Sequence, residues 1–391
     1  MIRGVAILVL AIAIIVAWFA YERTTAPGPE SSPGAAVPTE PGAGEFRDDL
    51  GQRRPVPMPA TLEQRYSMSS FGCSVDDADP YVAETHDEDA FHHRIAAIAG
   101  DLALSGDVEH VLASVILSRS GGVFTAPERI EQALALDPAN ELVLWTADML
   151  CADGTDGGYC GDAGFQRNRD AILARNGSHW LRQAPRFLAA GDELRALDAL
   201  ERASTEPEFE SYFIDYAMLL ERALAATSDM EYVMRMTTAI GYAASMPIEP
   251  IEILRICKDR SESDSRWLAL CIRVNERLVS DGNTLLLQML GRGYLATLYE
   301  YSGQTKARDA IVAERDAWRQ RLRTANPDRD IAMLSDPGFY AQYIDAFASG
   351  GESAALEFAN AEIARRKQDA DYDPCANVPA ATSPSTGSGR E

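Results

Sequence analysis

The stretch SHWLRQAPRFLAAGDELRALDALERASTEP, residues 178–207, predicts two short helices that fold back on each other. Apolar residues in its first half recur with the 3.6-residue period of one helical face. Gly191 then offers the left-handed conformation that ends a helix, and Asp192 offers a side-chain cap for the next one. An apolar stripe follows at Leu194, Ala196, Leu197, Leu200 and Ala203, and Pro207 ends the pattern.

A helical hairpin of this size cannot bury its apolar face alone. It needs neighbouring hairpins on both sides, as in helical repeat proteins. Helical periodicity continues through most of the chain after Tyr66, with almost no alternating β pattern. The sequence therefore predicts an all-α fold of antiparallel helical hairpins stacked as an irregular array.

The hairpin resembles a tetratricopeptide repeat in the residues that fall at or next to the signature spacings of that family, namely Trp180, Ala184, Phe187, Gly191, Ala196, Leu200, Ala203 and Pro207. It departs from the motif at Gln183, where the family prefers Leu, and at Ala184, where it prefers Gly. Leu200 replaces the preferred Phe, and Pro207 comes one residue early. The resemblance covers residues 178–207 well and the other helices loosely. It implies a TPR-like stack that binds other proteins and performs no catalysis.

The chain begins with a segment that predicts a membrane anchor. Residues 1–3 would be cytoplasmic, and residues 4–21, GVAILVLAIAIIVAWFAY, are long and apolar enough to span a bilayer. Arg3 precedes this span, and aromatic residues lie at its far edge. A single-pass protein of the bacterial inner membrane, with its C-terminal domain in the periplasm, is expected. The alternative is a cleaved signal peptide and secretion.

The remaining chain divides by composition into three parts. Residues 22–65 are rich in Pro and Gly and predict a disordered linker, because they lack the apolar residues that repay ordering. Residues 66–375 form the expected α-helical repeat domain, and residues 376–391 form a disordered tail. Further helices are predicted at residues 87–104, 108–118, 126–136, 140–151, 208–226, 230–246, 249–258, 265–280, 284–301, 305–324, 337–348 and 352–368.

Composition excludes some partners. The formal net charge of −23 leaves no broad basic surface for phosphate groups, so neither nucleic acid nor anionic lipid is expected to bind by electrostatics. Apolar residues make up 46% of the chain, which is ample for a core. A protein or peptide is the expected partner.

Six cysteines follow the apolar segment, which fits an oxidising compartment. Six cysteines allow 15 pairings, but spacing favours some of them. Cys151 and Cys160 flank a short Gly-rich loop, and Cys257 and Cys271 would link two antiparallel helices. The remaining pair, Cys73 with Cys375, forms only if the two ends of the domain meet. A catalytic thiol is the competing interpretation, but the chain has no C-x-x-C motif.

Three stretches contain metal-ligating or basic side chains. Glu88 with His92 and Asp89 with His93 share a helical face and could hold Zn²⁺, although acidic residues at a helix start need no metal. The loop with Asp153, Asp156 and Asp162 could bind Ca²⁺, or could be a connection closed by the disulfide. A basic stretch could receive an acidic peptide or be a solvated helix face, and comprises Arg315, Arg319, Arg321 and Arg323 with Trp318.

No stretch indicates catalysis or a cofactor. Residues 291–296 match G-x-G-x-x-A, but they lie in a helical pattern without a preceding strand, so helix packing is the favoured interpretation. We predict no catalytic, cofactor or metal residue, and expect an interaction scaffold or adaptor in the cell envelope. The alternative is an envelope hydrolase whose base is a histidine, among His86, His92, His93, His110 and His179.

Overall fold

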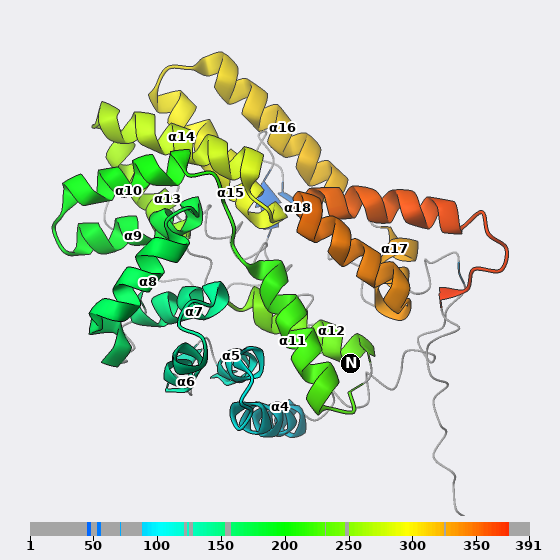
Figure 1. The fold of residues 1–391 in the computed structure, drawn as a ribbon. Coiled ribbons are helices and arrows are strands. Elements are labelled where there is room, and N and C mark those ends of the chain that lie inside the picture. Colours follow the sequence, from blue (N-terminus) through cyan, green and yellow to red (C-terminus); the bar gives the residue numbers. More distant parts are fainter. Residues whose placement is uncertain are drawn as a thin grey trace, which may run out of the picture.

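The computed structural model describes residues 45–47, 53–55, 71, 88–120, 123–124, 128–152, 158–230, 232–246, 250–323 and 326–374. Within them the fold is all-α, as predicted, with fifteen α-helices labelled α4 to α18 (Figure 1). Among the described helices, none is both long and apolar enough to cross a membrane. The expected anchor at residues 4–21 and the tail at residues 376–391 lie outside the described residues.

The first half of the domain contains α4 (Glu88–Ala103), α5 (Val108–Leu117), α6 (Arg129–Leu136), α7 (Glu141–Ala152), the 3-10 helix η2 (Gly158–Gly161), α8 (Ala163–Leu173), α9 (Gly177–Ala189), α10 (Glu193–Thr205), α11 (Phe213–Thr227) and α12 (Tyr232–Ala244). The second half contains α13 (Pro250–Ser261), α14 (Ser265–Asp281), α15 (Leu285–Tyr301), α16 (Thr305–Arg323), α17 (Pro327–Ser335) and α18 (Pro337–Arg366).

The strands of the described chain form two short antiparallel pairs. β1 (Glu45–Arg47) pairs with β2 (Arg53–Pro55), inside the segment expected to be a linker. β3 (Arg119–Ser120) pairs with β4 (Val123–Phe124) after α5.

Short polar side chains start many of these helices by accepting hydrogen bonds from otherwise unpaired N–H groups of the first turn. Asp192 caps α10 by accepting from the Arg195 N–H at 3.1 Å, as the sequence predicted. Side-chain caps of the same kind are provided by Asp107, Asp162, Asn176, Asp264, Thr284, Asn326 and Asp336.

Three predicted glycine turns are confirmed by backbone angles in the left-handed region, where a side chain would be strained. Gly191 separates α9 from α10 with φ 76°, and Gly303 separates α15 from α16 with φ 71°. Gly351 has φ 75° and breaks α18 into the two segments that the sequence predicted.

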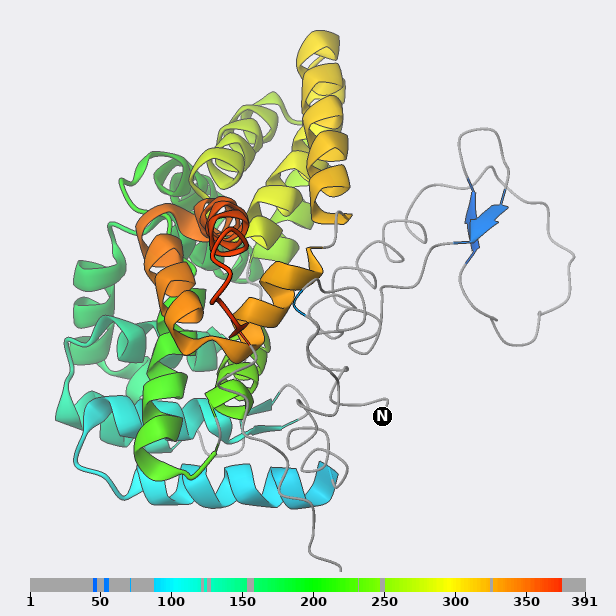
Figure 2. The same ribbon diagram turned by 90° about the vertical axis from the view of Figure 1, so that its right-hand side faces the viewer.

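The hairpins do not stack in the order of the chain. The α11–α12 hairpin leaves the stack and packs on α4 and α5, in the lower part of Figure 1. The α9–α10 hairpin instead packs on α13 and α14. Two large cores result: one joins α4 to α8 with α11 and α12, and the other joins α9 and α10 with α13, α14 and α15. Viewed from the side, α4 lies at one end of the molecule and α16 at the other (Figure 2).

Two helices of the structure were not predicted from the sequence: α8, whose buried apolar side chains are few, and the nine-residue α17. The start of α11 was predicted at residue 208, five residues too early. The residues just before α11 do not form helix because they pair with another part of the chain: the Glu208 carbonyl accepts from the Gly177 N–H at 2.8 Å. The backbone of Tyr212 is also left-handed, with φ 57°, so the helix begins only after it.

The residues of the repeat signature differ in burial. Ala184, Ala196, Leu200 and Ala203 are fully buried where α9 and α10 meet. Trp180 and Phe187 are half-buried against the same core, while Gly191 and Pro207 are exposed. The prediction that Leu194 belongs to the core stripe is wrong, because 71% of this residue is exposed.

Both short-range disulfides are confirmed. Cys151 and Cys160 are bonded with a Cα–Cα distance of 5.7 Å, and Cys257 and Cys271 with one of 5.6 Å. The second bond links α13 to α14 and is completely buried. Cys73 and Cys375 lie outside the described residues, so their pairing stays a prediction.

Replacing both Cys257 and Cys271 with Ala should lower the free energy of unfolding by about 3 kcal/mol, because the disulfide restricts a loop of 14 residues in the unfolded chain. Urea unfolding of the oxidised protein measures this change. Peptide mapping without reductant should find Cys257 linked to Cys271. Free thiols at both positions in folded protein would contradict the pairing.

Candidate functional site

The candidate metal-ligating residues do not converge in the described structure. His92 and His93 are exposed on α4, His110 contacts Ser105 from α5 at 3.1 Å, and His179 is buried in α9. His86 lies outside the described residues. In the part of the chain that the structure describes, no three His, Cys, Asp or Glu side chains are grouped to hold a metal ion.

Asp162 and Gly291 have local structural roles. Asp162 caps α8 by accepting from the Phe165 N–H at 2.8 Å, while Asp153 and Asp156 lie outside the described residues. Gly291 confirms the helix-packing interpretation: a Cβ there would lie 2.9 Å from the Leu278 Cβ, so glycine permits the close approach of α14 and α15.

The basic stretch lies on α16. Arg315 and Arg319 both pair with Asp316, at 3.4 and 3.6 Å. Trp318 is buried, with the Arg292 guanidinium 5.6 Å from its ring centre. The side chains of Arg321 and Arg323 are outside the described set.

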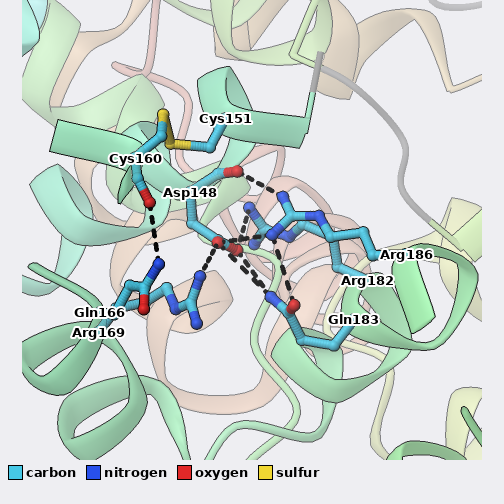
Figure 3. Close-up of a disulfide and its surroundings, with 8 residues drawn as sticks. All are labelled: Asp148, Cys151, Cys160, Gln166, Arg169, Arg182, Gln183 and Arg186. Carbon is cyan, nitrogen blue, oxygen red and sulfur yellow. Dashed lines mark hydrogen bonds and ion pairs between the residues drawn. A yellow bond between two sulfur atoms is a disulfide. The ribbon is translucent and has the colours of Figure 1, made fainter. Parts of the chain in front are cut away.

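A buried ion cluster centres on Asp148, in the middle of α7 (Figure 3). The Arg186 Nη1 donates to Asp148 Oδ1 at 2.7 Å, and the Arg169 Nη1 donates to the same oxygen at 3.1 Å. The Gln183 amide donates to Asp148 Oδ2 at 3.2 Å, and Arg182 lies 3.5 Å from that oxygen. These partners come from α8 and α9, so one carboxylate joins three helices.

The cluster is out of contact with solvent at its centre. The Asp148 side chain is 0% exposed, and that of Arg182 is 5% exposed. Arg182 donates to the Trp145 carbonyl at 3.1 Å, and its guanidinium lies 3.6 Å from the centre of the Trp145 ring. Cation–π contact and hydrogen bonding offset part of the cost of removing the Arg182 charge from water.

Electrostatics fixes the charge state of the cluster. Burial by itself raises the pKa of Asp148, but Arg182, Arg186, His179 and Arg169 outweigh it and hold that pKa far below its usual range. Burial lowers the pKa of His179 to about 3, although the nearby Asp148 opposes the shift. Asp148 is therefore ionised and His179 neutral at neutral pH.

Gln183, at the position where the tetratricopeptide motif prefers Leu, belongs to the cluster. A leucine at this position could not donate to Asp148, whereas the glutamine amide does. Sequence reasoning missed the cluster, although one signal was present. Asp148 stands alone in the apolar run of α7, and Arg182 and Arg186 share a face of α9 at i, i+4 spacing.

The Cys151–Cys160 disulfide lies beside the cluster and reinforces the same junction (Figure 3). Cys151 follows Asp148 on α7, and Cys160 precedes α8. The Gln166 amide of α8 donates to the Cys160 carbonyl at 3.1 Å. The junction is thus suited to fixing helix positions rather than to contacting a ligand.

An accessible candidate site is a shallow groove between α10 and α14, with a volume of about 470 Å³. Each helix contributes four residues at i, i+3, i+4 and i+7 spacing, which places them on one face. They are Leu194, Leu197, Asp198 and Glu201 of α10, and Arg266, Ala269, Leu270 and Arg273 of α14. We call this surface the α10–α14 groove.

The groove has an apolar base and charged edges. Leu197 and Leu270 are buried at its base, whereas Leu194 and Ala269 are exposed. A leucine that is 71% exposed beside buried leucines presents apolar surface to an incoming side chain. Leu194, which the sequence placed in the core stripe, thus lies in the accessible site.

Replacing Asp148 with Asn should destabilise the fold by about 3–5 kcal/mol, because it leaves buried arginines without their counter-charge. Asp170→Asn is the matched control, since Asp170 also pairs with Arg169 but is 56% exposed. Asp170→Asn should lower the free energy of unfolding by less than about 1 kcal/mol. Urea unfolding of both variants at pH 7 measures the difference, and equal small effects would contradict the assigned role of Asp148.

Acidification from pH 7 to pH 5 should cost about 2 kcal/mol of stability through His179 alone. The folded pKa is about 3, below the usual value of 6.5, so the unfolded chain binds the extra proton first. The stability contribution is complete above pH 6.5 and is lost as pH falls toward 3. In His179→Leu this part of the pH dependence should vanish. The measurement is the free energy of unfolding of both proteins as a function of pH. The same slope between pH 7 and pH 5 in wild type and His179→Leu would refute the role of His179.

Comparisons with known protein families, curated proteins and solved structures find no match to this chain.

Proposed function

We propose that this protein is a binding module that docks a helix of a partner protein in the α10–α14 groove. The observation that carries the proposal is the exposed Leu194 beside the buried Leu197 and Leu270. Apolar surface gains free energy when a partner removes it from water, at about 25 cal/mol per Å². The interaction role expected from the TPR-like hairpin agrees with such a site.

A helical partner fits the shape of the groove. The lining residues of each helix span seven positions, which is about 10 Å, or two turns. A partner helix with apolar residues at i, i+4 and i+7 presents anchors over the same length. Such a helix would place its anchors on Leu194 and on the base of the groove.

In this proposal the N-terminal segment, residues 4–21, tethers the helical domain to the bacterial inner membrane, and the domain faces the periplasm. The apolar run after Arg3 and the two disulfides support that placement, because disulfides persist in oxidising compartments. Within the described chain nothing favours the alternative hydrolase: the groove lining contains no histidine, and His179 is buried with Asp148.

A peptide selection tests the proposal. A displayed library of helical peptides with Leu fixed at i, i+4 and i+7, and random residues elsewhere, is selected on the full chain purified without reductant. Selected peptides should bind wild type, and Leu194→Glu should weaken them by about 10- to 100-fold, because a leucine anchor contributes about 1.5–3 kcal/mol.

Leu104→Glu is the matched control, because Leu104 is 86% exposed but lies outside the groove. This variant should bind the selected peptides like wild type. Failure to select any peptide, or equal binding by Leu194→Glu and wild type, would refute the docking function.

A further inference from the structure

The two edges of the α10–α14 groove carry opposite charges. The α10 edge presents Asp198 and Glu201, and the α14 edge presents Arg266 and Arg273. All four residues are exposed. Their charges sum to zero, so the groove has no overall attraction for a peptide of one sign. Arg273 of one edge pairs with Glu201 of the other, so the difference in sign across the groove is carried mainly by Asp198 and Arg266.

The two helices run in the same direction along the groove. Near their starts, the Trp267 indole N–H donates to Glu193 at 3.0 Å, and further along both helices Arg273 pairs with Glu201. The Glu201–Arg273 pair therefore crosses one end of the groove. Neither Asp198 nor Arg266 forms an ion pair with another residue that the structure describes, so these two charges are accessible to a partner.

We propose that the α10–α14 groove selects a partner helix with basic residues along one flank of its apolar stripe and acidic residues along the other. Basic residues would lie beside Asp198 and Glu201, and acidic residues beside Arg266 and Arg273. This inference rests on the proposed docking function and adds the chemistry of the partner.

The same charges determine the direction in which the partner lies. Turning a docked helix end to end keeps its apolar stripe in the groove but exchanges its two flanks. Only one direction then places each flank against the opposite charge, and the other direction places like charges together. Like-charge contacts disfavour the reversed helix. The groove therefore discriminates between the two directions of a partner helix as well as between partner sequences.

Three peptides that share one selected apolar stripe test the charge selection by fluorescence anisotropy on the full chain. One has Lys on one flank and Glu on the other, one has Lys on both flanks, and one has Glu on both. The mixed peptide should bind about tenfold more tightly than either other peptide at low salt. The difference should shrink as salt is raised, because exposed charges are screened.

Variants of the edges should change the preference in a defined way. Arg266→Glu combined with Arg273→Glu makes both edges acidic and should favour the peptide with Lys on both flanks. Asp198→Arg combined with Glu201→Arg makes both edges basic and should favour the peptide with Glu on both. Arg195→Glu is the control, because Arg195 is exposed on α10 but does not line the groove. This variant should leave the order of affinities for the three peptides unchanged.

A photo-crosslinker at the amino end of the mixed peptide reports the direction in which the peptide lies in the groove. It should label one end of the groove, near Leu194 or near Glu201, and a peptide with its two flanks exchanged should label the opposite end. Equal affinities of the three peptides for wild type, or labels at both ends for each mixed peptide, would overturn the charge selection. If the peptides still bind in a Leu194-dependent way but show no preference for flank charge, the charge selection is wrong and the docking function still holds. Absence of binding by all three peptides would overturn both.

Discussion

One buried carboxylate ties the α9–α10 hairpin to α7 and α8. Asp148 takes hydrogen bonds from α8 and α9 at once, and no part of its side chain reaches solvent. Apolar packing tolerates small rotations of a helix, but ion pairs inside a core do not, because each misplaced charge stays unpaired. This constraint holds α9 against α7 and α8, and α10, which packs along α9, forms one side of the groove.

The departure of α11 and α12 from the stack has a second effect on the groove. In an array that follows chain order, α11 and α12 would be the next helices to stack on the α9–α10 hairpin. Because these two helices pack on α4 and α5 instead, helices from separate hairpins become neighbours. The groove therefore combines residues about 70 positions apart in sequence, such as Glu201 and Arg273, which form an ion pair with a separation of 72.

Sequence reasoning predicted the features that depend on local physics. Helical period, Gly191, Gly303 and Gly351, the Asp192 cap and two disulfides of short span all follow from residues close together in the chain. It missed α8, which buries little apolar surface, and placed Leu194 in the core because periodicity alone does not say which neighbour covers a face. The Asp148 cluster and the groove need tertiary contacts between α7 and α9 and between α10 and α14. Local patterns can mark a lone buried charge such as Asp148, but they do not say which helices come together.

The two disulfides differ in how accessible they are to an external reductant. Cys151 and Cys160 are half-buried, so an external thiolate can approach this bond in the folded protein. Cys257 and Cys271 have no exposed surface, and a thiolate reaches them only after α13 and α14 move apart. The rate at which the inner bond is reduced is therefore a measure of how often this part of the core opens. The protein thus contains an internal reporter of local unfolding, located on the helix α14 that also lines the proposed docking groove.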